Sequence, residues 1–369
     1  LKVRRGLGTD DEVKASALVE EMNELLQNET WWTAGKFSEA QEKFDHRIVN
    51  AFYDGIQASF PDSFDTRNKI IPLPGKEEGY AKVLFVGTTG AGKTSLLRHL
   101  IGSDPEFDRF PSTSTSRTTV SDIEVIPAAG EFKAVVTFFS ETVIQTNIED
   151  CIINACSAVW DNQPEHKIAD RFLHHPDQRF RLSYLLGSWR KNILAEADED
   201  EWGFGAPDEV VSTSSNNDET VSTTDAKLLQ TQLAQYVKRI SVLGEKNAKR
   251  IREELLPDPS TATPEDKEAA REIFEEEVFT DELFHEIVHD VMDEALQRFS
   301  AINNGELSYQ STSSKWPLMW IYNTNDRTEF LKQVRWFSSN FALSFGKLLT
   351  PLVDGIRVMG PLFPTFTED

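Results

Sequence analysis

Residues 83–97 read VLFVGTTGAGKTSLL, and this stretch says more about the fold than any other part of the chain. Within it, Gly87 to Thr94 fit the pattern GxxxxGK[ST], with an apolar segment before the loop and a helical segment after it. The glycines let the backbone turn sharply and aim amide groups at a phosphate, while Lys93 and the start of the helix add positive charge. The stretch therefore predicts a strand, a phosphate-binding loop and a helix, in that order.

The loop defines a first set of candidate binding residues. The Thr94 hydroxyl is the natural ligand for a Mg²⁺ ion that accompanies a bound phosphate. The alternative is a glycine-rich turn whose lysine has no special role, and the order of strand, loop and helix argues against it. The residues that we expect to contact the nucleotide are Gly87, Thr88, Thr89, Gly90, Ala91, Gly92, Lys93, Thr94 and Ser95.

Composition limits the classes of partner. The chain has 369 residues, of which 39% are hydrophobic and 27% charged, so we expect a folded protein of one large domain or two ordinary ones. Its net charge of −23 repels nucleic acids and anionic lipid at long range. No run approaches the roughly 20 apolar residues that span a bilayer, and the first residues lack the apolar core of a signal peptide. We expect a soluble protein.

The cysteines argue against a disulfide framework. The stretch CIINAC, from Cys151 to Cys156, contains both of them within an apolar run. This spacing predicts one helix with two buried thiols, and neither a disulfide nor a cysteine-based zinc site. A reducing cytoplasm fits this pattern.

Hydrophobic periodicity outlines the rest of the chain. Residues 9–60 have helical spacing, 61–79 form a connection marked by proline and glycine, and 81–87 read as a short apolar strand. A helix is expected from Lys93 to about residue 101. Residues 121–126 and 132–139 read as two strands whose short connection predicts an antiparallel hairpin.

The second half is predicted to be mostly helical. Residues 142–315 have helical spacing, and an acidic stretch, 196–226, interrupts them as a mobile excursion. Thr263, Pro264 and Asp266 predict a capped helix start. Residues 315–322 and 355–360 read as strands around a helix, 328–349. That helix would place on one face Phe330, Val334, Phe337, Phe341, Phe345 and Leu348.

The segment after the first helix carries a family resemblance. Residues 110–122 read FPSTSTSRTTVSD and place Thr118 and Thr119 just before the first predicted hairpin strand. This order resembles the Era-like and dynamin-like branch of the P-loop GTPases, in which a threonine of this loop binds magnesium. The resemblance makes Thr119 the better match for that role. The alternative is a surface loop rich in serine and threonine.

A second motif of that family stands near the end of the chain. In MWIYNTNDRTEF, residues 319–330, Asn323 and Asp326 match the NKxD motif, with Thr324 in place of its lysine. The resemblance implies that Asp326 pairs with guanine and so selects GTP over ATP. A different interpretation is equally open: Asp326 is a helix N-cap, and Glu329 completes a capping box with it.

The family's DxxG motif is altered. The second hairpin strand should end in an aspartate, but Ser140 stands at that position, Glu141 follows and no glycine comes. Glu141 is a candidate to hold the metal through a water, or to act as a Walker-B-type base as in ATPases. It is also explained as the first residue of the next helix. Binding is therefore a firmer expectation than hydrolysis.

One competing motif suggests zinc. HEIVH, from His285 to His289, matches HExxH, in which two histidines hold Zn²⁺ and Glu286 activates water. Glu294 and Glu306 are the available third ligands. The alternative is an amphipathic helix in which the histidines flank the apolar face.

These observations predict an α/β protein with a three-layer α/β/α P-loop NTPase core, a mixed sheet and a large, mainly helical insertion. The domains would be N-terminal helices (1–80), the first half of the core (81–141), the insertion (142–315) and the second half of the core (316–369). An N-terminal helix from 9–60 is expected to fill the place of the final helix that the GTPase core lacks.

The function expected is Mg²⁺-dependent nucleotide binding by a GTPase-like switch or mechanochemical protein that hydrolyses GTP slowly. Lys93, Thr119 and Glu141 would be its catalytic residues. The alternatives are a nucleotide-binding scaffold without turnover, an ATPase of another P-loop class that uses Glu141, and a zinc peptidase. The expected partners are a protein at the helical insertion and a second copy of the chain in a nucleotide-dependent dimer.

Overall fold

The computed structural model describes residues 12–32, 36–53, 62–87, 91–103, 110–111, 122–174, 180–189, 223–256, 262–309, 314–339 and 346–363. The chain divides into two compact units, Leu1–Asp65 and Thr66–Asp369, which are described separately. Neither contains a described helix that is both long and apolar enough to cross a membrane.

The first unit is a small helical domain, as its periodicity predicts. It consists of α1 (Glu12–Gln27), the 3-10 turn η1 (Glu29–Trp31), α2 (Phe37–Lys43) and α3 (His46–Tyr53). Helical spacing puts Leu18 and Leu25 on one side of α1, where they face the other helices. The buried core comprises Leu18, Leu25, Ala40, Phe44, Ile48, Val49, Phe52 and Tyr53.

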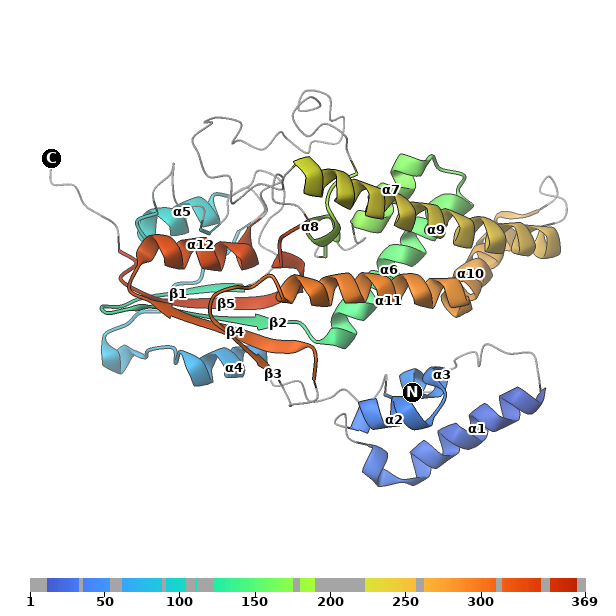
Figure 1. Ribbon diagram of the computed structural model, residues 1–369, viewed down its shortest axis with the longest axis horizontal. Coiled ribbons are helices and arrows are strands. Elements are labelled where there is room, and N and C mark those ends of the chain that lie inside the picture. The colour runs from blue at the N-terminus through green and yellow to red at the C-terminus, as the bar shows by residue number, and fades with distance from the viewer. Residues whose placement is uncertain are drawn as a thin grey trace. The chain divides into compact units, whose positions relative to one another are not determined.

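The second unit is built on a mixed sheet (Figure 1). Its strands are β1 (Asp122–Pro127), β2 (Phe132–Phe138), β3 (Glu306–Tyr309), β4 (Pro317–Thr324) and β5 (Val353–Gly360), in the order β1-β5-β2-β4-β3. β1 is parallel to β5, while β2 is antiparallel to both β5 and β4. The α/β class and the mixed sheet agree with the sequence prediction.

The predicted hairpin is wrong, although both of its strands exist. β5 lies between β1 and β2, so the two strands do not pair with each other. The connection between β1 and β2 is instead hydrogen-bonded to the end of β5, where the Ala128 N–H donates to the Gly360 carbonyl at 2.7 Å. Four residues are enough to step across one intervening strand, since strands lie about 4.8 Å apart.

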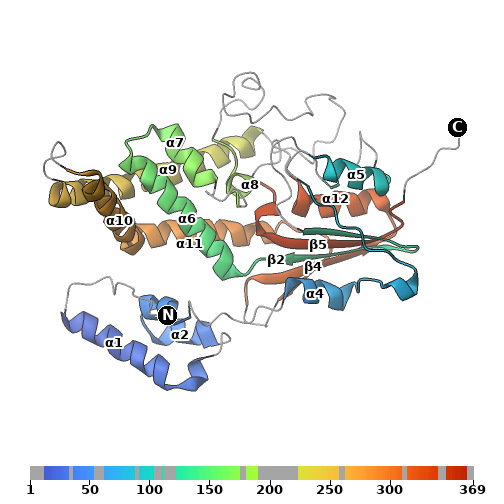
Figure 2. The ribbon, with the colours of Figure 1, turned by 180° about the vertical axis from the view of Figure 1, so that it is seen from behind.

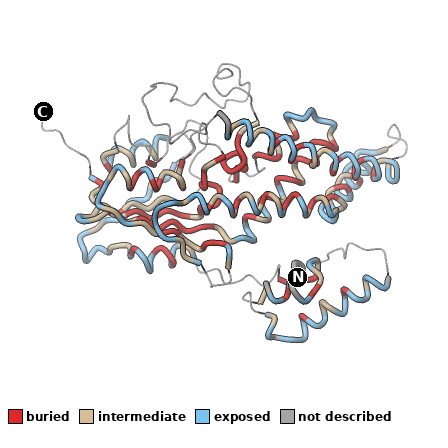
Figure 3. Tube along the Cα trace, viewed as in Figure 1, coloured by how far each residue is buried: buried red, intermediate tan, exposed pale blue. Residues whose placement is uncertain are grey.

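Helices cover both faces of the sheet. α5 (Lys93–Leu100) and α12 (Arg327–Ser338) lie over one face, and α4 (Ser63–Ile70) lies over the other (Figure 1). The alternation along β2 explains this, because Ala134 and Val136 point into the main core while Val135 joins a smaller cluster with Ile71 and Ile126. Figure 3 shows the buried residues running through the strands and the inner sides of the helices.

The helical part continues from β2. It consists of α6 (Glu141–Trp160), α7 (Glu165–Leu173), α8 (Ser183–Leu186), α9 (Thr223–Leu255), α10 (Pro264–Thr280) and α11 (Glu282–Phe299) (Figure 2). α6 and α9 approach closely at Gly244, where a Cβ would lie 2.8 Å from that of Val159. The cores of the helices and of the sheet form one continuous cluster.

Two local predictions in this part are confirmed. Thr263 and Asp266 form a capping box at the start of α10, with Pro264 in the first turn. Cys151 and Cys156 are free, buried thiols on α6, and burial raises the pKa of both. These thiols are therefore core groups and not nucleophiles.

Several element boundaries differ from the prediction. Residues 81–87 form no strand, and α4 occupies part of the predicted connection, where the Asp65 N–H donates to the Asp62 carboxylate at 2.9 Å. β3 interrupts the region predicted to be helical, and α12 ends at Ser338. Phe341 and Phe345 lie outside the described residues, as does most of 196–226, although α9 already begins at Thr223.

The expected packing of a helix from 9–60 on the sheet remains a prediction. The helix that covers the second face of the sheet is α4, which lies outside that range. Its side chains from Thr66 onward pack within the second unit.

Candidate phosphate-binding site

The described part of the loop folds back on itself at the start of α5. Gly92 has a φ of 79°, a left-handed conformation that favours glycine, and its carbonyl accepts from the Leu96 N–H at 2.9 Å as the helix begins. The Lys93 Nζ donates to the Gly87 carbonyl at 2.7 Å. The two ends of the loop are therefore joined by the lysine that the motif requires. Thr88, Thr89 and Gly90 lie outside the described residues.

The loop is accessible to a ligand. Gly87, Ala91, Gly92 and Ser95 are exposed, while Lys93 and Thr94 are half-buried. The first-turn amides of a helix have no partner within the helix, and they carry partial positive charge. The start of α5 can therefore receive an anion without displacing packed side chains.

The two ends of the sheet define the position of the site. Pro127, Phe132, Thr324 and Gly360 lie at one end of their strands, which we call the Gly360 end; Asp122, Phe138, Pro317 and Val353 lie at the other, the Val353 end.

The C-terminal end of α5 lies at the Gly360 end. Arg327, which follows β4, donates through Nη2 to the Gly102 carbonyl at 2.9 Å. The chain before the loop also starts there, because the Tyr80 hydroxyl donates to the Pro127 carbonyl at 2.9 Å. α5 lies along the sheet (Figure 1). The phosphate loop is therefore displaced toward the Val353 end by the length of α5, about 12 Å.

Glu141 also lies toward the Val353 end. It is the first residue of α6, and Ser140 caps that helix by accepting from the Val143 N–H at 3.2 Å. Partial burial of the carboxylate raises the pKa of Glu141, and the positive charge of Lys315 opposes the rise. The residue is exposed overall, so solvent limits the change in pKa. The structure thus gives Glu141 the helix-start position and leaves its carboxylate accessible.

Asn323 and Asp326 lie at the opposite end. Asn323 is in register with Lys133 at the start of β2, whereas Glu141 follows the end of that strand. β2 separates the two positions by roughly 20 Å at 3.3 Å per residue. The two candidate motifs are therefore not brought together at one end of the sheet.

Asp326 is an N-cap. Its carboxylate accepts from the Glu329 N–H at 3.1 Å and so begins α12. In a full capping box the Glu329 side chain would accept from the Asp326 N–H. Here that N–H donates to the Thr324 hydroxyl instead, at 3.1 Å. Glu329 instead accepts from Gln333 at 2.7 Å. The capping interpretation of Asp326 is confirmed.

The magnesium-binding candidates can be placed only in part. Thr94 is the second residue of α5, next to Lys93. Thr118 and Thr119 lie outside the described residues, but β1 begins shortly after them at Asp122, at the Val353 end. Their role remains a prediction.

The HEIVH motif lies on α11, where Glu286 and His289 each contact a neighbouring side chain. Glu286 lies 3.4 Å from Arg239 Nη2, and His289 lies 3.5 Å from the Asp293 carboxylate. His289 is mostly exposed. The face between the histidines packs into the core, as the amphipathic alternative requires.

The two possible third ligands are dispersed. Glu294 pairs with Arg298 on the same helix at 3.4 Å, and Glu306 starts β3. Within the part of the chain that the structure describes, no group of three or more His, Cys, Asp or Glu side chains is arranged to hold a metal ion.

A buried polar junction beneath α4 was not predicted. Arg357 of β5 is fully buried and donates to both carboxylate oxygens of Glu124, at 2.7 and 3.1 Å. Arg67 of α4 donates to the same carboxylate at 3.1 Å and to the Thr137 hydroxyl at 2.7 Å. Gly355 leaves room for it, because a Cβ there would overlap the Arg67 guanidinium. The sequence signal was a charged residue, Glu124 or Arg357, between apolar residues in the middle of each of two strands.

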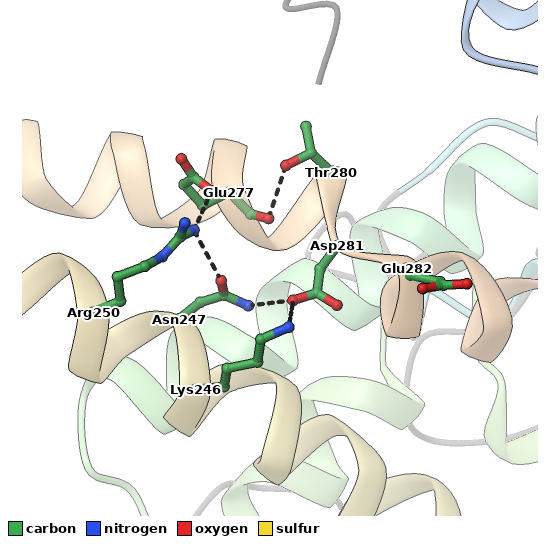
Figure 4. Close-up of a pocket in the computed structure, with 7 residues that line it drawn as sticks. All are labelled: Lys246, Asn247, Arg250, Glu277, Thr280, Asp281 and Glu282. Atoms are coloured by element: carbon green, nitrogen blue, oxygen red, sulfur yellow. Dashed lines mark hydrogen bonds and ion pairs between the residues drawn. The ribbon is translucent and has the colours of Figure 1, made fainter. Parts of the chain in front are cut away.

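A polar cavity of about 380 Å³ lies elsewhere, between α9 and the junction of α10 with α11. Four of its charged groups contact one another (Figure 4): Lys246 bonds to Asp281 at 2.7 Å, and Arg250 pairs with Glu277. Asn247 also donates to Asp281, at 3.1 Å. These contacts explain the cavity as a joint between helices rather than as part of the phosphate loop.

Comparison of the chain with protein-family models, with curated proteins and with solved structures gave no match. The residues and their geometry are therefore the basis for assigning a function.

Proposed function

We propose that this protein binds a nucleoside triphosphate through the loop 87–95 and acts as a GTPase-like switch. The observation that carries the proposal is the closed loop at the start of α5, in which Lys93 bonds to the Gly87 carbonyl and Gly92 adopts a left-handed conformation. A bound phosphate would take the lysine's hydrogen bond and accept from amides of the first turn, which have no partner within the helix.

Magnesium belongs to the same proposal. The Thr94 hydroxyl, one residue beyond Lys93, would be one ligand, and Thr119 is the second candidate. A Mg²⁺ ion would neutralise phosphate charge, which matters in a chain of net charge −23.

The nature of the base is a separate question. GTP is favoured by the family resemblance. The position of Asp326, at the Gly360 end and engaged as an N-cap, gives that assignment no added support. An adenine nucleotide is therefore the comparison that the binding assay must include.

The test is calorimetric titration of the chain with Mg²⁺ and GTP or ATP. Lys93→Ala should weaken binding at least tenfold, because a charge-assisted contact to phosphate is worth about 1.5–3 kcal/mol. Lys69→Ala removes the same charge from the exposed side of α4 and should leave the affinity unchanged. No binding of either nucleotide, or equal effects of the two substitutions, would contradict the proposal.

The second candidate is an ATPase that uses Glu141. It is favoured by one observation, namely that Glu141 and the phosphate loop both lie toward the Val353 end of the sheet. In the same assay, Glu141→Gln should abolish turnover while the nucleotide still binds. Glu165→Gln is the matched control, since Glu165 is also the first residue of an exposed helix start. Turnover that persists in Glu141→Gln would exclude this role.

A further inference from the structure

The segment that leads into the phosphate loop is apolar but exposed. Residues 81–87 adopt no regular secondary structure. The relative exposure is 72% for Val83, 85% for Leu84 and 83% for Val86. Exposed apolar side chains are a cost unless another arrangement of the chain buries them.

β1 offers an edge along which such a segment can pair. It is the outermost strand of the sheet among the described residues. The bond from the Ala128 N–H to the Gly360 carbonyl fixes which groups face β5, because the direction alternates along a strand. Glu124 and Ile126 therefore direct their N–H and C=O groups toward β5, and Ile123 and Val125 direct theirs outward.

The outer edge of β1 already accepts one hydrogen bond from Tyr80, the residue just before the segment. The Pro127 carbonyl faces outward and accepts from the Tyr80 hydroxyl at 2.9 Å. Pro127 itself suits an edge strand, since it has no N–H to leave unpaired there. Residue 81 thus begins beside the end of β1.

The direction and the length of the segment 81–87 both suit pairing with β1. From Tyr80 the chain must travel away from the Gly360 end to reach the phosphate loop, and β1 runs toward the Gly360 end. The segment would lie antiparallel to β1. Five to seven extended residues span roughly 17–24 Å, which covers the six residues of β1.

We propose that residues 82–86 pair with β1 as an additional antiparallel strand when a nucleotide phosphate occupies the loop. This inference rests on the proposed function for its ligand. The strand would bury Val83, Leu84 and Val86 and would satisfy the outward groups of Ile123 and Val125.

Lys93 links the ligand to the strand. In the structure its ammonium group donates a hydrogen bond to the carbonyl of Gly87, the last residue of the segment. A phosphate competes for the same ammonium group and releases Gly87 from it. In this proposal the lysine contact belongs to the open state, so a ligand that removes the contact favours the paired state.

The experiment is residue-resolved hydrogen exchange of the full chain, with and without Mg²⁺ and a non-hydrolysable GTP or ATP analogue. Upon binding, the amides of Ile123 and Val125 and every second amide within residues 82–86 should slow at least tenfold. The amides of Glu124 and Ile126, which already bond to β5, should change little. This alternation separates strand addition from general stabilisation by the ligand.

Leu84→Pro removes a strand amide at an exposed site and should abolish the protection of Ile123 and Val125 while the nucleotide still binds. Leu84→Ala keeps the amide and should retain the protection. Nucleotide binding with unchanged exchange at Ile123 and Val125 would overturn the strand alone. Protection of both amides before the ligand is added would overturn it as well. No nucleotide binding would overturn the proposed function and the strand together.

Discussion

At the scale of single residues, Asp281 has the best-defined chemistry in the helical part. It caps α11 by accepting from the Leu283 N–H at 3.0 Å, and its other oxygen accepts from Lys246 and Asn247. Burial of the side chain raises its pKa, but these hydrogen bonds outweigh burial, so the pKa of Asp281 is lowered from 3.8. One carboxylate therefore joins three helices.

Asp281→Ala should lower the free energy of unfolding by about 2 kcal/mol, because it removes an N-cap and leaves the buried Asn247 amide with the Leu243 carbonyl as its remaining acceptor. Asp281→Asn should lose less, since asparagine is also a good N-cap. Urea denaturation at neutral pH measures both.

The contribution of Asp281 should depend on pH with a definite sign. Because the folded-state pKa lies below the unfolded value of 3.8, the contribution is complete above 3.8 and disappears as the pH falls through the lower folded value. The difference between wild type and Asp281→Ala should therefore shrink in acid. Glu245→Ala, on the exposed side of α9, is the control. A difference that stays constant with pH would contradict the role of the charge.

At the scale of elements, two substitutions in the polar junction beneath α4 should lower stability by different amounts, and the difference tests whether the carboxylate is shared. Glu124→Ala would leave the guanidinium groups of Arg67 and Arg357 buried without their shared carboxylate, and should cost about 3 kcal/mol. Arg357→Met should cost roughly half of that, because Glu124 keeps Arg67 and the methionine fills the space. Thermal unfolding measures both. Equal losses would show that the carboxylate is not shared.

The same elements show what sequence patterns can and cannot predict. The alternation of apolar residues located β1, β2, β4 and β5 to within a few residues, because strand faces are a local property. It did not predict the neighbours of β1 and β2, since a pattern of faces does not specify which strand lies beside which. α4 was not predicted because it lies between Pro61 and Pro72, whose turn signals outweighed those of a short helix of about two turns.

At the candidate site and the polar junction, too, local features could be predicted and contacts between distant residues could not. The loop closure by Lys93 follows from a local motif that spans residues 87–94. The contact between Glu124 and Arg357 joins positions 233 residues apart, which no local pattern encodes. Asp326 matched both the NKxD motif and a helix N-cap. In the structure its side chain accepts from an N–H in the first turn of α12, as an N-cap does.

At the scale of the whole molecule, the two units have separate cores. The helices of the first unit bury their own apolar residues, and the main cluster contains residues of the second unit only. A fragment of residues 62–369 should therefore unfold cooperatively within about 3 °C of the corresponding transition of the full chain. Scanning calorimetry of both measures this. A fall of about 10 °C or more would show that residues 9–60 stabilise the sheet, as the sequence had suggested.

The insertion of β5 between β1 and β2 has a consequence for synthesis of the chain. A hairpin would pair as soon as it left the ribosome, but the partner of β1 is made roughly 230 residues later, which takes about 10–45 s at 5–20 residues per second. During that time β1 has no native partner among the described strands, and its pairing is a long-range contact of the kind that slows folding. Among the described strands, the last to be translated is therefore the one that completes the sheet.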